Sequence, residues 1–182
     1  MTTVSHASKH LRFVAALAAI VTVVAALGLG AAVAQDGEVV EVEMTASDGV
    51  YYFDPVGLHV EPGTTIRFVN VRDVHNTLSY SEDNGKPQRI PDGADGWASP
   101  MFTEEGGTFE VTLSEEGVYD YFCQPHEALG MVGRIVVGDP EAFPARDPGE
   151  LQFDAAADAL PSVDAIMADE DGRLTFEEAN AD

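Results

Sequence analysis

The sequence predicts an all-β fold, an antiparallel β-sandwich, for the middle of a chain of 182 residues. Several short segments alternate apolar and polar residues, which is the pattern of strands with one buried face. Turn signals separate these segments, and helix-length amphipathic runs are not evident, so an α/β fold is disfavoured. The composition changes on both sides of this region and divides the chain into residues 1–34, 35–138 and 139–182.

The first half of the sandwich is expected between Val39 and Asn70. Apolar residues at every second position predict strands at residues 39–45, 51–53, 58–60 and 65–70. Asp48-Gly49 is a turn signal between the first two strands. Glu61-Pro62-Gly63 fits a turn in which Pro takes the first central position and Gly supplies the positive φ at the second.

The second half is expected to begin after a long irregular connection. Residues 81–100 are polar and rich in Gly and Pro, so we expect a loop with at most a short helical turn. Trp97 is expected to pin this loop to the core; shielding of a functional site by Trp97 and Met101 is the weaker alternative. Strands are then expected at residues 109–113, at residues 118–122 and after Gly133.

The segment between the last two expected strands carries candidate metal ligands. Cys123, His126 and Met131 bring a thiolate, an imidazole and a thioether into one short loop. Copper prefers such ligands, and a blue-copper site has two His and one Cys in a plane with a weak axial Met. His75, where a strand gives way to a loop, is the expected second His. The other histidines precede an apolar segment or lie in a strand, and they are His6, His10 and His59.

These residues resemble a known family, the cupredoxins, and most closely its pseudoazurin, plastocyanin and halocyanin group. The resemblance rests on the Cys-x2-His-x4-Met spacing, the Gln-Pro between Cys123 and His126, the His-Asn pair upstream and the segment Ile90–Gly96. It extends over residues 39–138 and implies a cupredoxin-like Greek-key sandwich.

The resemblance also implies the chemistry of the site. It implies one type 1 copper that cycles between Cu+ and Cu2+, bound in the plane by His75, Cys123 and His126 and axially by Met131. Asn76 would tie the His loop to the Cys loop, because metal ligands are usually held by hydrogen bonds from residues behind them.

The predicted function is that of an extracytoplasmic mononuclear blue-copper protein, which shuttles single electrons between redox protein partners and is not an enzyme. By the resemblance, His126 is the edge at which electrons are exchanged, with Pro125 and Leu129 around it. The alternatives are a copper-binding carrier or accessory protein, a zinc site, and a domain of a copper enzyme. Copper enzymes need further histidines for catalytic copper, and Met is a poor zinc ligand, so electron transfer is favoured.

The N-terminal residues 1–34 predict a secretory signal peptide or a membrane anchor. Lys9 and Arg12 precede an uncharged run at residues 13–34, which ends in the small residues Ala32-Val33-Ala34. The run is long enough to span a bilayer, so cleavage and retention as an anchor are both open. Either outcome places the following domain outside the cytoplasm, as a secreted protein or one anchored to the outer face of the membrane through residues 13–34.

The charge of the chain excludes one class of partner. Lys and Arg number 9 against 32 acidic residues, a formal net charge of -23. Nucleic acid is therefore not expected as a partner, because phosphate contacts need a basic surface. Such a surface repels itself unless salt screens it, which predicts a halophilic protein; an ordinary acidic extracytoplasmic protein is the alternative.

Residues 139–182 are expected to form an acidic, largely flexible tail that contributes little to the core. Four prolines break this stretch, and acidic residues far outnumber basic ones. Residues 169–178 resemble the latter part of an EF-hand calcium loop, with Gly172 at the sharp turn and Glu178 as the last acid. Met167 stands where the first calcium ligand would be, so a solvated acidic helix is the favoured alternative.

Overall fold

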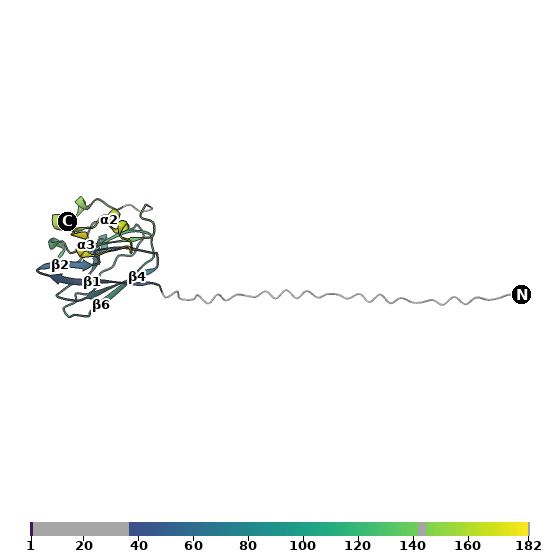
Figure 1. Cartoon of the computed structure of the whole chain (residues 1–182), viewed down its shortest axis with the longest axis horizontal. Helices are drawn as coiled ribbons and strands as arrows, with labels where there is room; N and C mark the ends of the chain where they lie inside the picture. Colours follow the sequence, from purple (N-terminus) through teal and green to yellow (C-terminus); the bar gives the residue numbers. More distant parts are fainter. Residues whose placement is uncertain (2–36, 142–144, 182) are drawn as a thin grey trace. The chain divides into compact units, whose positions relative to one another are not determined.

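The computed structural model describes Met1, residues 37–141 and residues 145–181 (Figure 1). Chain contacts group residues 35–182 into one compact unit. Apart from Met1, the predicted signal peptide or anchor at residues 1–34 lies outside the described residues. Among the helices that are described, none has the length and apolar character needed to cross a membrane.

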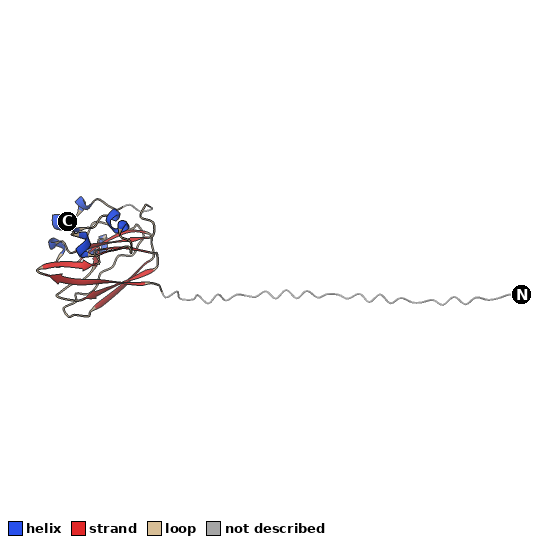
Figure 2. Ribbon diagram, in the orientation of Figure 1, coloured by secondary structure: helices blue, strands red, loops and turns tan. Residues whose placement is uncertain are grey.

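Two β-sheets form a sandwich, as the alternating pattern predicts (Figure 2). The strand order is β2-β1-β4-β6 in the first sheet and β5-β7-β8-β3-β9 in the second. The first sheet consists of β1 (Val39–Ser47), β2 (Val50–Asp54), β4 (Thr64–Asn70) and β6 (Thr108–Leu113). The second consists of β3 (Gly57–Val60), β5 (Leu78–Ser79), β7 (Gly117–Phe122), β8 (Val132–Val137) and β9 (Arg173–Leu174).

The main core lies between the two sheets and is built from the apolar residues that alternate along the strands. Ile66 and Phe68 of β4 are fully buried, whereas the residues on either side of them are partly exposed. Leu58 and Val60 of β3 are buried, and His59 between them is partly exposed. Each large apolar side chain buried in this way contributes about 1.5–3 kcal/mol to folding.

The prediction of an antiparallel sandwich is wrong for two strand pairs. β1 and β4 are parallel, with Val40 opposite Ile66, and β3 and β8 are parallel, with Leu58 opposite Ile135. The chain leaves the first sheet after β2, adds β3 to the second sheet and returns as β4, so strands that are not consecutive become neighbours. Alternation identifies the buried face of a strand but not its partner, and it could not reveal these pairings.

Both turns predicted in the first half are confirmed. Asp48 and Gly49 have φ angles of 53° and 83° and join β1 to β2. Positive φ at both positions matches the twist of the flanking strands in a two-residue hairpin. Gly63 has a φ of 93°, and the Thr64 amide donates to the Glu61 carbonyl at 3.2 Å, which closes the second turn.

The long connection between β5 and β6 is irregular, as predicted, and contains the 3-10 turn η1 (Glu82–Asn84). Trp97 pins it to the core, where its ring packs near Phe68 and Tyr121. The Trp97 Nε1 donates to Thr77 Oγ1 at 3.1 Å, so the polar edge of the buried ring is satisfied. Met101 is exposed.

The prediction of a largely flexible tail is wrong for residues 145–181, which we call the C-terminal segment. Its elements are η3 (Pro148–Glu150), α1 (Asp154–Ala159), α2 (Val163–Ala168), β9 and α3 (Phe176–Ala179). β9 pairs antiparallel with β3, so the strand expected to be the last, β8, is followed by another. Figure 2 shows the helices gathered on one side of the sandwich.

Apolar side chains explain why this segment folds despite its charge. β7 and β8 are buried at every position, so both faces of the second sheet are covered. Two apolar clusters join the outer face of the sheet to the C-terminal segment. One contains Tyr80, Phe122, Val132, Leu151, Ala156 and Leu160, and the other contains Val56, Val136, Ile166 and Leu174. The consecutive apolar residues 135–137 of β8 lack the alternation of a half-exposed strand, which is typical of a strand covered on both faces.

A buried charge network also holds the C-terminal segment to the sheet. Asp120 of β7 is fully buried and accepts hydrogen bonds from Arg89 at 2.9 Å and from Arg134 at 2.7 and 3.0 Å. The two guanidinium groups also donate three hydrogen bonds to backbone carbonyls of the segment, at 2.8–3.0 Å. Those carbonyls belong to Arg146, Asp147 and Pro161. Breaking such a network leaves a buried charge unpaired, which is strongly destabilising.

The stretch that resembles an EF-hand uses its carboxylates within the local fold. Asp169 Oδ1 accepts from the backbone amides of Asp171 and Arg173 at 3.0 and 2.9 Å. Glu178 Oε2 accepts from the Thr175 amide at 3.0 Å, which completes a capping box at the start of α3. These carboxylates shape a turn and a helix start on the edge of the second sheet.

The packing of α2 yields a prediction about stability. Ile166 is fully buried, and a Cβ atom placed on Gly57 of β3 would lie only 2.5 Å from its Cγ1. Ile166→Ala should therefore lower the free energy of unfolding of the metal-free protein by about 2–5 kcal/mol. The neighbouring Met167 is exposed, and Met167→Ala should cost about 1 kcal/mol or less. Equal small effects in urea unfolding would contradict the docking of the C-terminal segment.

Candidate metal centre

The loop between β7 and β8 carries three of the four predicted ligands. Cys123 directly follows β7, and Met131 directly precedes β8. The Cys123 amide donates to the Met131 carbonyl at 3.0 Å, and the His126 amide donates to the Cys123 carbonyl at 3.0 Å. The turn η2 (Glu127–Leu129) follows His126. The backbone of this loop is therefore closed on itself before any metal binds.

His75 reaches the site from the chain between β4 and β5. Its backbone forms an antiparallel bridge with Phe102, with N–O distances of 3.1 and 2.8 Å. The His75 side chain is fully buried. A residue in a loop thus has the backbone support of a strand, which limits how far its ring can move.

Asn76 joins the two loops, as predicted. Its Oδ1 accepts from the Gln124 amide at 2.8 Å, and its Nδ2 donates to the Gln124 side chain at 3.3 Å. Gln124 follows Cys123 directly. Asn76 therefore couples the backbone next to His75 to the backbone next to the thiol, which is the support that metal ligands usually have.

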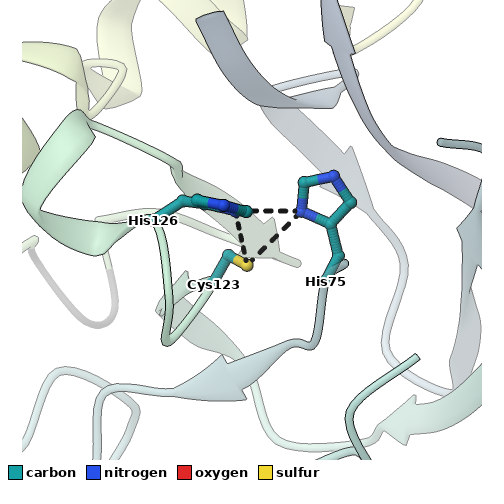
Figure 3. Close-up of side chains that lie close together, drawn as sticks. All are labelled: His75, Cys123 and His126. Atoms are coloured by element: carbon teal, nitrogen blue, oxygen red, sulfur yellow. Dashed lines mark hydrogen bonds between the residues drawn. The ribbon is translucent and has the colours of Figure 1, made fainter. Parts of the chain in front are cut away.

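The structure brings His75, Cys123 and His126 together (Figure 3). The Cys123 Sγ lies 3.5 Å from His75 Nδ1 and 3.6 Å from His126 Nδ1, and the two Nδ1 atoms are 3.3 Å apart. A point equidistant from three atoms at these separations lies about 2.0 Å from each. Metal–nitrogen bonds of about 2.0–2.1 Å and metal–thiolate bonds of about 2.3 Å are known for zinc, so one small metal ion fits at the centre of this triangle.

Met131 lies at the end of the loop that carries Cys123 and His126. Its side chain is fully buried within the main core, and its backbone bonds to both Cys123 and His126. Two imidazoles and one sulfur atom, with a methionine in the same loop, suit copper better than calcium or magnesium, which prefer oxygen ligands.

Burial controls protonation of the ligands in the metal-free protein. Desolvation, with a smaller contribution from the charge of His126, lowers the pKa of His75 to about 4. Desolvation raises the pKa of Cys123 to about 11, against backbone hydrogen bonds that favour the thiolate. Desolvation also lowers the pKa of His126. At neutral pH the imidazoles are therefore ready to bind a metal, whereas the thiol must first lose a proton.

Tyr51 is a residue of the site that the sequence analysis missed. Its ring stacks on the His126 ring with centroids 3.7 Å apart and an interplanar angle of 4°. Tyr51 belongs to β2, which is in the other sheet. The sequence pattern around Tyr51 predicted only that it lies in a strand. No local signal could have revealed the contact, because it depends on how the two sheets pack.

Comparisons with known proteins agree with this geometry. The sequence model for copper binding proteins of the plastocyanin/azurin family matches residues 40–138. Plastocyanin from Fritillaria agrestis is 36% identical over 124 residues, which cover 65% of this chain and 72% of that protein. Plastocyanin from Oryza sativa subsp. indica is 35% identical over 128 residues, which cover 68% of this chain and 75% of that protein.

A solved structure is also similar. A pseudoazurin from Sinorhizobium aligns with a TM-score of 0.53 and 33% identity, covering 67% of this chain and 90% of that one. The family match ends at residue 138, so the C-terminal segment lies beyond it. The match, the similar chains and the triangle of donors lead to one conclusion: this chain is a copper-binding member of the plastocyanin/azurin family, a cupredoxin.

Proposed function

We propose that this cupredoxin is an extracytoplasmic mononuclear blue-copper protein that carries single electrons between redox partners. His75, Cys123 and His126 would bind copper in one plane, and Met131 would be its weak axial ligand. The observation that carries the proposal is the triangle of one sulfur and two nitrogen atoms with sides of 3.3–3.6 Å. Bound copper would supply the one-electron redox chemistry.

The residues around the triangle would keep it fixed while the charge of the metal changes. The Asn76–Gln124 hydrogen bonds couple the two loops, and the backbone bond between Cys123 and Met131 closes one of them. A site that is already in place needs little movement when an electron arrives or leaves. This rigidity supports a carrier of electrons over a carrier of copper, which must release its ion.

The surface near His126 supports electron exchange at that residue. His126 is partly exposed, whereas His75 and Cys123 are buried. Leu129, three residues further along, is 60% exposed. Val74 and Met101 are also exposed and are chain neighbours of the bridged pair His75 and Phe102. An apolar surface beside the one accessible ligand suits transient docking of a redox protein.

The net charge of the chain determines how salt would affect docking of a partner. With a formal net charge of -23, long-range attraction to a basic partner would be strong in dilute salt and nearly absent in molar salt. Apolar contact does not weaken in this way. We therefore propose docking through the apolar surface around His126, with the protein secreted or anchored outside the cytoplasm.

Copper loading tests the proposed ligands. The chain from Gln35 onward, given Cu(II), should turn blue through charge transfer from the thiolate and should cycle reversibly by one electron. Cys123→Ala should abolish the colour. Met131→Gln should keep a thiolate band but lower the reduction potential, because the axial ligand tunes the site. A colourless protein that binds one zinc ion and no copper would contradict the proposal.

The pKa of the thiol predicts how copper affinity depends on pH. Burial raises the pKa of Cys123 to about 11 and lowers that of His75 to about 4, so near pH 8 copper displaces one proton, from the thiol. The apparent affinity for Cu(II) should therefore rise about tenfold per pH unit between pH 7 and 9. Competition with a chelator of known proton affinity measures the slope. An affinity independent of pH in this range would show that copper binding displaces no proton from Cys123.

A charge placed on the proposed docking surface tests the electron exchange edge. Leu129→Glu should slow bimolecular electron exchange with a redox partner by tenfold or more, as a rough expectation for a charge buried in an apolar contact. Val39→Glu adds the same charge at the far end of β1 and serves as the matched control, since Val39 is also exposed.

The rate of electron exchange of the native chain should stay constant or rise as the salt concentration increases. A steep fall with salt and no effect of Leu129→Glu would contradict apolar docking.

A further inference from the structure

A residue of the metal-ligand loop, Glu127, forms a buried ion pair with Lys86. Glu127 follows the proposed ligand His126 in sequence, yet its side chain is buried, with 4% of the residue exposed. Lys86 Nζ contacts Glu127 Oε2 in a short salt bridge, and the Lys86 side chain is itself largely buried. Lys86 is one of two lysines in the chain, beside Lys9. A carboxylate of a very acidic protein is thus buried and paired with one of its few ammonium groups.

The contacts of the pair reach the chain on both sides of the site. Tyr80 Oη donates to Glu127 Oε1 at 3.0 Å. Lys86 Nζ lies 4.9 Å from the centre of the Phe122 ring, and Phe122 precedes Cys123. The ring of Phe153, in the C-terminal segment, lies 5.8 Å away on the same ammonium group. The pair therefore touches the chain next to His126, the chain next to Cys123 and the segment that covers the second sheet.

Electrostatics gives this arrangement a consequence for the metal. A charge close to a partly buried metal is weakly screened, so an unbalanced carboxylate beside the loop would favour Cu2+ over Cu+. An unbalanced ammonium group would favour Cu+ instead. With both charges present and in contact, the two effects oppose each other. The pair also joins three segments, through the salt bridge and through the position of the ammonium group over two aromatic rings, which restrains the loop.

We propose that Lys86 and Glu127 are positioning residues of the copper site: their ion pair anchors the ligand loop and holds the reduction potential at an intermediate value by balancing two opposite charges. The inference rests on the proposed function, because a reduction potential exists only for the copper-loaded protein. Tyr80 supports the carboxylate through its hydroxyl group, and the ring of Phe153 lies beside the ammonium group.

Opposite shifts from two single variants test the charge balance. Glu127→Gln leaves the positive charge of Lys86 and should raise the reduction potential, whereas Lys86→Met leaves the negative charge of Glu127 and should lower it. Each change should alter the ratio of Cu(I) to Cu(II) affinity by about tenfold, which is about 59 mV for a one-electron couple. The double variant K86M/E127Q should return close to the native potential. Voltammetry at pH 8 measures all four proteins.

Control variants separate charge balance from a general loosening of the fold. Lys86→Arg keeps the positive charge and should leave the potential nearly unchanged. Glu110→Gln removes a carboxylate from an exposed pair with Arg67 in the first sheet and should also leave it unchanged. Tyr80→Phe leaves no unpaired charge; it removes one hydrogen bond from Glu127 and should lower the potential less than Lys86→Met does.

The metal-free protein provides a second readout that needs no copper. Removing one charge leaves its partner buried and unpaired, so each single variant should unfold at a lower urea concentration. The double variant should be more stable than the two single effects would sum to.

The outcomes distinguish the two proposals. A native chain without a thiolate band contradicts the proposed function. A blue native chain in which Glu127→Gln and Lys86→Met shift the potential in the same direction, or not at all, overturns the charge balance alone. If a single variant does not fold, Tyr80→Phe and the double variant decide: a Tyr80→Phe potential equal to or above the native one would overturn it.

Discussion

The closure of the loop between β7 and β8 is the constraint on which the site depends. A backbone hydrogen bond of 3.0 Å from Cys123 to Met131 joins the two ends of the loop across neighbouring strands. β7 and β8 pair over their whole lengths, from Gly117 opposite Val137 to Phe122 opposite Val132, so the ends of the loop cannot separate without breaking the sheet. Asn76 then fixes the loop of His75 to this frame. The arrangement of the three proposed ligands thus depends on the pairing of two strands, on the side-chain amide of Asn76 and on the backbone bridge between His75 and Phe102.

The same two strands are covered on both faces, and this links the site to the C-terminal segment. A Cβ atom placed on Gly130 of the ligand loop would lie 3.1 Å from the Ala155 carbonyl and 3.3 Å from Ala159 of α1. Phe122, next to Cys123, is buried in the cluster that contains residues of α1. The segment therefore covers one flank of the loop and leaves the flank of Leu129 exposed. Phe122 is therefore buried, whereas His126 at the other end of the Cys123–His126 turn stays partly exposed.

Three of the seven cationic side chains in the described part of the chain are used inside the fold. Arg89 and Arg134 share the buried carboxylate of Asp120 and bind carbonyls of the C-terminal segment. Lys86 balances Glu127 behind the ligand loop. Because Arg89 and Arg134 are buried and Lys86 is largely buried, the exposed surface is even more dominated by acidic side chains than the composition suggests. The predicted need for salt screening thus becomes stronger, since repulsion acts between the charges that remain outside.

The sequence by itself determined the sandwich class, most strand positions, the turns at Asp48-Gly49 and Glu61–Gly63, and the set of candidate ligands. These features depend on local rules: period-two burial, the φ angles that Gly permits, and the ligand chemistry of Cys, His and Met at a short spacing. Asn76 could also be predicted, because it adjoins a ligand.

Only the tertiary structure decided which strands are parallel, how the C-terminal segment folds and what surrounds the ligands. Each of these depends on contacts between residues far apart in the chain. Net charge and prolines predicted that residues 139–182 stay flexible. Ile166 and Leu174 are buried instead, because the sheet offers an apolar outer face at β3 and β8 on which they pack. Tyr51 on His126 and Lys86 on Glu127 are likewise pairs over long sequence separations. Local sequence patterns cannot predict such contacts, because the pattern around a strand or loop residue is the same whether or not a distant residue packs against it.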